Sequence, residues 1–331
     1  MAVSTITSPT FGQMAKAVTP GWDSILPIIE LLSLRHGLHA ALGFQQANGA
    51  VSHRTQVRTG LPTPTWRMFN RGVPATNDQT ANVTFNVAIL KDVFEIDEEL
   101  YKIAPDKAQY MLQRASAHIE GMAQEWSSTG IYGTAANPEE FVGLSSMYSD
   151  VTAQNGRNVL DAGGVDGADN TSIYLINGGP TVFGAYPLGT MAGITRSGAQ
   201  TVWSENLGGT GLRGMVVREE YTMGGGLVVE DWRDVVRIGS IDVSNLIAQV
   251  ADADLLFWTR KAKARMLSQP VHKRFWLMNS TTFEYLDHQR SDRQFGGGGV
   301  TTQSIDGISM DTLHGYPIII DDNILNTEAA V

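Results

Sequence analysis

The chain of 331 residues contains no cysteine. Disulfide bonds, zinc sites built on thiolates and cysteine nucleophiles are therefore excluded. The chain also lacks any apolar run close to the roughly 18 residues of a membrane-spanning helix, so we expect no membrane contact. The first 20 residues contain no basic segment followed by an apolar run, so we expect no signal peptide and synthesis in the cytoplasm.

Motifs for catalysis or cofactor binding are scarce. The seven histidines show no metal-ligand spacing such as H-E-x-x-H, and no G-x-S-x-G nucleophile elbow occurs. Gly209–Gly214 matches the dinucleotide pattern G-x-G-x-x-G, but a strand-like run follows it where a helix is required. Asp161, Asp166 and Asp169 lack the EF-hand spacing; Asx turns explain them, with a bound cation as the alternative. We therefore expect no catalytic residue, no cofactor and no metal.

The composition favours a folded protein of mixed secondary structure. Hydrophobic residues make up 42% and charged residues 18% of the chain, which is typical of folded domains. The 35 glycines exceed the usual share of about 7% and indicate many turns. We expect an α+β protein with a sizeable core rather than a helical bundle.

The charge is unevenly distributed along the chain. No acidic residue lies between Glu30 and Asp78, and this window has a charge of +5. The net charge of the whole chain is −10, which leaves −15 for the rest. Such a balance argues against binding nucleic acid over the whole surface and favours contact between a basic segment and an acidic body.

One long helix is predicted from about residue 105 to about residue 129. Pro105 and Asp106 suit its first turn, and Gly130 and Gly133 are expected to end it. A buried stripe at helical spacing is formed by Met111, Ala115, Ile119, Met122 and Trp126.

Residues 44–90 have the pattern of a long β-hairpin. Strand-like alternation occurs around 51–59 and again at 82–89, with prolines, arginines and aromatic residues between them. A hairpin of this composition cannot bury itself well, so we expect it to need a partner surface. The acidic run Glu95, Asp97, Glu98, Glu99 and Asp106 is the candidate surface. The alternative is that the arginines only solvate a loop.

The remaining elements are weaker predictions. We expect an extended arm at 1–20, a docked helix within 23–42, loops at 145–170, short strands at 172–177 and 182–183, and exposed Gly-rich chain at 196–215. Strands follow over 216–241, at 275–279 and at 316–320, with a short helix at 281–290 and a mobile loop at 291–302. Ser244 is expected to cap a second long helix, whose stripe is Leu246, Val250, Ala253, Phe257, Ala264 and Leu267.

Four segments together resemble major capsid proteins of tailed bacteriophages with the Hong Kong 97-like capsid fold, and most of all those of short-tailed phages (podoviruses). They are IYGTAANPEEFVGL at 131–144, SIYLINGGPTVFGAYPLGTMAGI at 172–194, GGLVVEDWRDVVRI at 225–238 and GYPIIIDDNILNTE at 315–328. Their order and spacing carry the resemblance, which covers about nine tenths of the chain.

The resemblance implies a division of the chain. It places an N-terminal arm and short helix at 1–43, an extended hairpin loop at 44–90, and a peripheral domain with a long spine helix at 91–150. Part of the axial domain with Gly-rich loops lies at 151–215, peripheral strands lie at 216–243, and axial helices and strands lie at 244–331.

The implied function is that of a structural protein, not an enzyme. Copies would form the hexamers and pentamers of an icosahedral viral head in the virion, around double-stranded DNA without base recognition. Scaffold and portal proteins and an outer cementing protein are the implied partners. The expected contacts between subunits involve Arg54, Arg58, Trp66, Arg67, Arg71, Glu95, Asp97, Glu98 and Glu99. Residues 44–90 contain no lysine, so we expect no covalent crosslinking of the kind seen in some relatives. The alternative is an encapsulin-like protein compartment.

Overall fold

The computed structural model describes residues 37–164, 169–207, 211–248, 253–266, 273–292, 300–305 and 308–331. The described chain divides into two compact units. The first contains residues 89–126 and 191–224, and the second contains residues 35–88, 127–190 and 225–331. The predicted arm at 1–20 and most of the predicted helix at 23–42 lie outside the described residues; the described part of that helix is α2, Gly37–Ala41.

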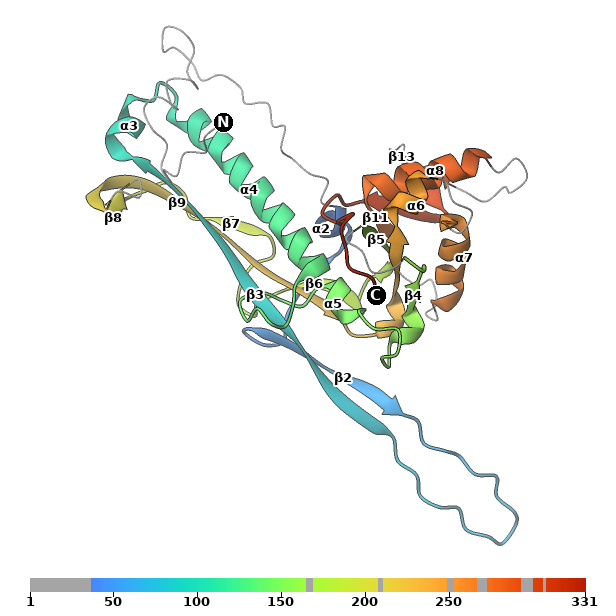
Figure 1. The fold of residues 1–331 in the computed structure, drawn as a ribbon. Coiled ribbons are helices and arrows are strands. Elements are labelled where there is room, and N and C mark those ends of the chain that lie inside the picture. Colours follow the sequence, from blue (N-terminus) through green and yellow to red (C-terminus); the bar gives the residue numbers. More distant parts are fainter. Residues whose placement is uncertain are drawn as a thin grey trace. The chain divides into compact units, whose positions relative to one another are not determined.

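The long helix is present as α4, Lys107–Tyr132 (Figure 1). Its 26 residues correspond to about 39 Å at a rise of about 1.5 Å per residue. The helix begins two residues after the predicted start at about 105 and ends three residues after the predicted end at about 129, directly before Gly133, which was predicted to end it. Asp106 lies just before the helix and accepts a hydrogen bond from the Gln109 amide at 3.0 Å, whereas Gly130 is inside the last turn.

Within the first unit, the helix faces the strands with a slightly different stripe from the predicted one. Met111, Ala115, Met122 and Trp126 are buried as predicted, but Ile119 is 42% exposed. Its neighbour His118 points inward instead, stacked on Tyr221 and in contact with Phe94. A step of three residues after Ala115, rather than four, therefore keeps the stripe on one face.

The strands of the first unit come from several segments of the chain. They are the end of β3 (Gln79–Asp97), β7 (Ile194–Arg196), β8 (Gln200–Leu207) and most of β9 (Leu212–Val229), with the short helix α3 (Glu98–Ile103) after β3. β7 and β8 pair with β9 in antiparallel register. The described residues of 196–215 are largely exposed as predicted, but β8 and the start of β9 form a ladder there, so the Gly-rich loop expected in this segment was wrong.

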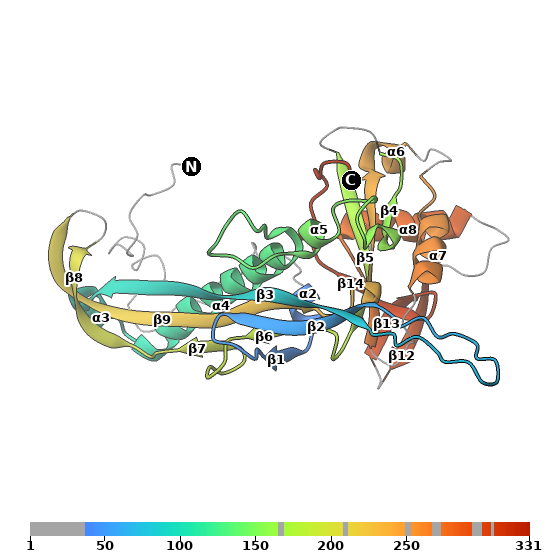
Figure 2. The same cartoon turned by 90° about the horizontal axis from the view of Figure 1, so that it is seen from below.

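The predicted hairpin is confirmed in the second unit. β2 (Ser52–Gly60) pairs with β3 in antiparallel register from Ser52↔Asn86 to Arg58↔Thr80, and a long connection without strand joins them (Figures 1 and 2). At the base of the hairpin, β1 (Phe44–Gln46) pairs with β6 (Val182–Tyr186), which pairs with the end of β9. β2 is the last strand in the order β1-β6-β9-β3-β2.

The main core of the second unit is a sheet of order β12-β13-β14-β11-β5-β10-β4. Its strands are Val300–Ile305, Ile308–Leu313, Tyr316–Ile320, Lys273–Met278, Asn170–Gly178, Val235–Asp242 and Val159–Asp161. Helices α7 (Leu255–Arg265) and α8 (Ser280–Asp292) cover one face, where Leu256, Ala262 and Leu286 join the core around Trp276. The short elements α5 (Leu144–Met147), η1 (Gly156–Asn158) and η2 (Trp232–Asp234) complete this unit.

The second long helix predicted after Ser244 was wrong. Two helices are present, α6 (Val243–Ile247) and α7, and each begins at an aspartate that accepts a hydrogen bond from a first-turn amide: Asp242 and Asp254. Phe257, expected in the buried stripe, is 54% exposed. The second capping residue restarts the helical phase, so one continuous stripe cannot describe both helices.

The chain leaves α4 through a turn that requires glycine. A Cβ on Gly133 would lie 2.1 Å from the carbonyl oxygen of Phe141, and the Gly143 amide donates to the Gly133 carbonyl at 2.8 Å. The segment at 131–144 is thus a closed loop held by its own backbone.

The predicted loop at 291–302 lies largely outside the described residues, and β13 was not predicted. Among the described helices, none combines the length and apolar character needed to span a membrane.

Candidate assembly surfaces

The hairpin connection, residues 61–78, is called the tip. Its apolar side chains have no cover within the described chain: Trp66 and Phe69 are 100% exposed, and Leu61 and Met68 are also largely exposed. Within the tip, the Arg71 amide donates a backbone hydrogen bond to the Met68 carbonyl at 3.3 Å and closes a turn. The tip therefore presents both apolar surface and unpaired backbone to solvent, which is typical of a binding segment.

The four arginines predicted at contacts all lie on the exposed hairpin. The Arg58 Nε donates to Asp78 at 3.0 Å, and the Arg67 Nε donates to the Arg71 carbonyl at 2.8 Å. The backbone of Arg54 is held by Asn48, while its side chain points to solvent. The hairpin thus carries a positive surface that its own residues neutralise only at Arg58.

The predicted acidic surface belongs to the first unit, and most of its carboxylates already have partners there. Glu95 receives the Arg218 guanidinium at 2.5 and 2.8 Å, and Asp97 caps α3 by accepting from the Glu99 amide. Glu98 and Glu99 both lie within 3.2 Å of Lys102 Nζ. Glu99 is the most open, with its side chain 78% exposed. The remaining negative charge is concentrated at the start of α3.

A groove of about 940 Å³ lies in the second unit, beside the hairpin. One wall is the odd-numbered face of β2 and β3, with Val57, Val83 and Phe85. The other wall includes Tyr148 and Trp232. Sequence reasoning missed this groove, because its two walls come from segments at least 62 residues apart (Phe85 to Met147) and no local pattern marks their contact.

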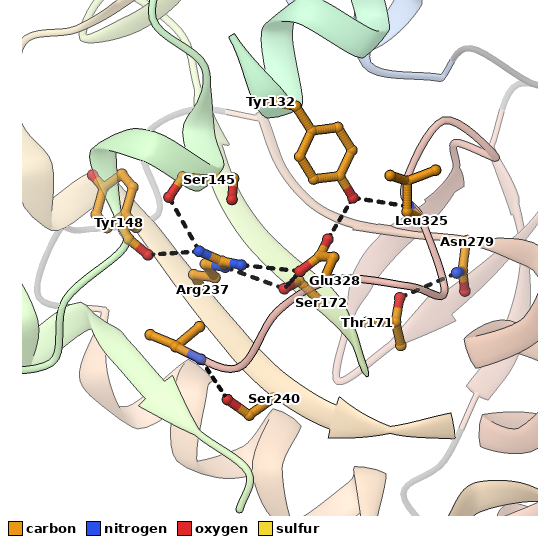
Figure 3. A network of polar contacts seen from close by, with 11 residues as sticks. Tyr132, Ser145, Tyr148, Thr171, Ser172, Arg237, Ser240, Asn279, Leu325 and Glu328 are labelled. Carbon is orange, nitrogen blue, oxygen red and sulfur yellow. Dashed lines mark hydrogen bonds and ion pairs between the residues drawn. The ribbon is translucent and has the colours of Figure 1, made fainter. Parts of the chain in front are cut away.

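A buried ion pair, also missed from the sequence, fixes the C-terminal segment in the second unit (Figure 3). Arg237 and Glu328 have side chains only 4% exposed, and the guanidinium Nη2 lies 2.9 Å from the carboxylate. The remaining donors of Arg237 reach Ser172 and the carbonyls of Ser145 and Tyr148, all within 3.1 Å. A buried ion pair of this kind is stable only when such additional hydrogen bonds satisfy it.

The carboxylate of Glu328 is equally well satisfied. It accepts hydrogen bonds of 2.5 Å from Tyr132, in the last turn of α4, and from Ser172. Burial and the adjacent Glu328 charge raise the pKa of Tyr132, because both disfavour the tyrosinate. Three residues further on, the amide of the last residue Val331 donates to Ser240 Oγ at 2.9 Å. The segment therefore links the end of α4 to the main sheet.

No metal or dinucleotide site is formed by the residues that the structure describes. They contain no cluster of three or more His, Cys, Asp or Glu side chains that could hold a metal. Asp161 accepts a hydrogen bond from the Gly163 amide at 2.9 Å, which is an Asx turn as predicted, and Asp166 lies outside the described residues. The pattern at 209–214 leads into strand β9, not a helix.

Comparison with known proteins identifies the fold and the family. The family model described as Major capsid protein GP7 matches residues 21–331. The structure of bacteriophage Epsilon15 matches at a TM-score of 0.71 and 25% identity, over 100% of this chain and 99% of that one. Two weaker matches follow. The capsid of the empty GTA particle matches at a TM-score of 0.43 and 10% identity, over 70% of this chain and 97% of that one. The SrpI encapsulin complex of Synechococcus elongatus matches at a TM-score of 0.44 and 10% identity, over 66% of this chain and 92% of that one. A comparison with curated proteins gave no match.

These findings confirm the predicted resemblance. The chain has the Hong Kong 97-like capsid fold, and α4 is its spine helix. The fold was recognised from segments whose order, rather than any one motif, was informative.

Proposed function

The chain belongs to the GP7 family of major capsid proteins, and on this premise we propose that its copies assemble as hexamers and pentamers of an icosahedral head around double-stranded DNA. It is a structural component of the virion capsid and not an enzyme. It acts by association between copies of the chain, through the surfaces described below.

The hairpin tip is the observation that carries this proposal. Two fully exposed aromatic side chains, Trp66 and Phe69, sit on an arm with no internal cover in the described chain. Aromatic residues and arginine are enriched where proteins bind each other, because they bury large areas and form directed hydrogen bonds. The tip is therefore the proposed contact with a neighbouring subunit, with Trp66 as its anchor.

Charge is proposed to guide the same contact. Arg54, Arg58, Arg67 and Arg71 bring positive charge on the hairpin. The receiving carboxylates on a neighbouring subunit are proposed to be Glu95, Asp97, Glu98 and Glu99. Within the described chain, the ionic partners of these four carboxylates are Arg218 and Lys102 only, so negative charge remains available for the arginines of a neighbouring subunit.

We propose that the shell is not covalently crosslinked. Residues 44–90, which include the hairpin, contain no lysine that could form such a crosslink. Denaturing gels of mature particles are expected to show a single monomer band of about 36 kDa, and a ladder of multimers would refute this statement.

Further partners follow from the family. A scaffold protein, a portal and an outer cementing protein are proposed, the last because a shell without covalent crosslinks needs other reinforcement. The acidic remainder of the chain suits an inner wall that does not bind packaged DNA.

The proposed division of the chain assigns 1–43 to the arm, 44–90 to the extended loop, 91–150 and 216–243 to the peripheral domain, and 151–215 and 244–331 to the axial domain.

The test reverses the charge of the hairpin. A chain in which all four arginines are replaced by glutamate is expected to remain folded and soluble but to form no shells, seen by sedimentation and negative-stain microscopy. Single replacements are expected to have little effect, because exposed ion pairs contribute about 0–1 kcal/mol each.

A second variant identifies the receiving surface. Adding Glu98→Arg and Glu99→Arg to the reversed hairpin should restore shells if these carboxylates receive the arginines. Normal shells from the four-glutamate variant alone would refute the proposed role of the charge.

A further inference from the structure

The outer edge of strand β2 is open along the groove. β2 ends its sheet order, so one of its edges has no neighbouring strand in the described chain. At the start of this edge, the side-chain amide of Asn48 donates to the Arg54 carbonyl at 2.6 Å and its oxygen accepts from the Arg54 amide at 2.8 Å. Asn48 thus binds the edge as the peptide groups of an adjacent strand would.

The next positions on the same edge have no such partner. In an antiparallel pair, alternate residues direct both their N–H and their C=O to the same side. Because Arg54 directs its groups to the open side, Gln56 and Arg58 do so too. Both residues line the groove, and no described strand pairs with them on that side. The groove therefore offers an unpaired strand edge along one wall.

The other surfaces of the groove are suited to apolar side chains. The hairpin face presents Val57 and Val83, and the opposite wall presents Met147 and Trp232, with the buried Tyr148 also in its lining. Proteins can bind an extended peptide at a strand edge next to an apolar groove. The edge forms hydrogen bonds with the peptide backbone, and the groove binds alternate side chains of the peptide.

We propose that this groove receives the hairpin tip of a second copy of the chain, with the backbone of residues 65–69 added alongside β2. This inference rests on the proposed function and names the acceptor for the tip. Residues 65–69 contain no proline, whereas Pro62 and Pro64 cannot donate to a ladder. In an extended segment, Trp66 and Met68 share one face, and both are exposed in the single chain. They are the side chains that enter the groove.

One carboxylate of the groove favours the same occupant. The groove is also lined by Arg58 and Arg233, but these are paired with Asp78 at 3.0 Å and Asp231 at 2.6 Å. Glu230 in the groove has His53 as its ionic partner among the described residues, at 3.1 Å, and no arginine or lysine. The tip brings Arg67 and Arg71 and has no carboxylate before Asp78. One arginine of the incoming tip therefore pairs with Glu230 at the edge of the groove, and the other hairpin arginines remain for the acidic residues Glu95, Asp97, Glu98 and Glu99.

The occupant comes from a different copy because of chain connectivity. Gly60 ends β2 and leads directly into the tip, which continues beyond the end of the strand (Figure 1). Apart from Leu61, which lines the groove, the tip and the groove are thus different surfaces of one chain, which makes the contact head-to-tail. Such contacts close into rings when the rotation between copies allows it.

The absence of cysteine makes a disulfide test unambiguous. One chain carries a cysteine in the tip, Thr65→Cys or Met68→Cys, and a second chain carries one at the groove, Gln56→Cys or Gln154→Cys. The two chains are co-expressed, and particles are purified, oxidised and run on non-reducing gels. The control replaces the groove cysteine by Phe257→Cys, on an exposed residue that does not line the groove.

A disulfide requires Cα atoms about 4.4–6.8 Å apart, so only residues that meet in the particle will join. The expected result is a shift from monomer to a reducible dimer band for at least one tip and groove pair, and no shift for single variants or the Phe257 control. Particles without any tip-to-groove dimer would overturn this inference and leave the proposed function intact. Failure of the unmodified chain to form particles of any size would overturn both.

Discussion

Removing the carboxylate of Glu328 should destabilise the second unit strongly. The Glu328→Ala change leaves the Arg237 guanidinium, with a side chain 4% exposed, without its counter-charge, and leaves Tyr132 and Ser172 without an acceptor. Breaking a buried ion pair by removing one partner costs about 3–5 kcal/mol. That is a large part of the roughly 5–15 kcal/mol by which folded proteins are stable. The free energy of unfolding is measured by urea titration of unassembled protein, followed by tryptophan fluorescence.

Two variants separate the ion pair from other causes. Replacing both partners, Arg237→Met with Glu328→Leu, should recover most of the lost free energy, because well-packed apolar residues often replace a buried pair at little cost. Glu205→Ala removes one half of the exposed pair with Arg213 and should change the free energy by less than about 1 kcal/mol. The reasoning would be refuted if Glu328→Ala were as stable as Glu205→Ala.

Three further predictions concern single elements of the second unit. Asp254→Ala removes the acceptor for the Phe257 amide at the start of α7 and should cost about 0.5–2 kcal/mol in the same urea titration, while Asp254→Asn should cost less. Gly133→Ala should reduce the yield of folded protein, because the new Cβ would lie 2.1 Å from the Phe141 carbonyl oxygen; a normal yield with unchanged circular dichroism would contradict this. Burial raises the pKa of Tyr174 to about 12, so its stabilising contribution is complete below about pH 10 and is lost as the pH rises through about 12. Tyrosinate absorbance and unfolding, measured together against pH, should therefore change in that window, and full titration of the tyrosines near pH 10 in the folded state would refute it.

Several long elements could be predicted from the sequence because the features that specify them are local. The long helix, the two strands of the hairpin and the strand at 316–320 each have a hydrophobic pattern of one period, and the structure confirms all of them. The lack of lysine at 44–90 and of cysteine anywhere are likewise facts of composition.

The errors occurred where a local signal had two readings. Ile119 and His118 are neighbours, and either one fits the helical spacing of the buried stripe. The packing of α4 against the strands, where His118 stacks on Tyr221, decided that His118 faces inward and Ile119 faces solvent. Asp254, in the middle of an apparent long helix, restarts the helix as a cap, although aspartate also occurs on helix surfaces.

By itself, the sequence determined the long helix, the strands of the hairpin and the exposed, basic nature of the hairpin, because periodicity, turn residues and charge are properties of neighbouring residues. The fold family came from the resemblance of four segments in their order along the chain. Only the tertiary structure decided that Arg237 pairs with Glu328, 91 residues later. It also decided that Asn48 binds the backbone of Arg54 at the edge of β2, while the next positions of that edge stay open beside a groove. These features depend on which distant segments meet. Such meetings are decided by packing and by the requirement that every buried charge finds a partner, which no local pattern encodes.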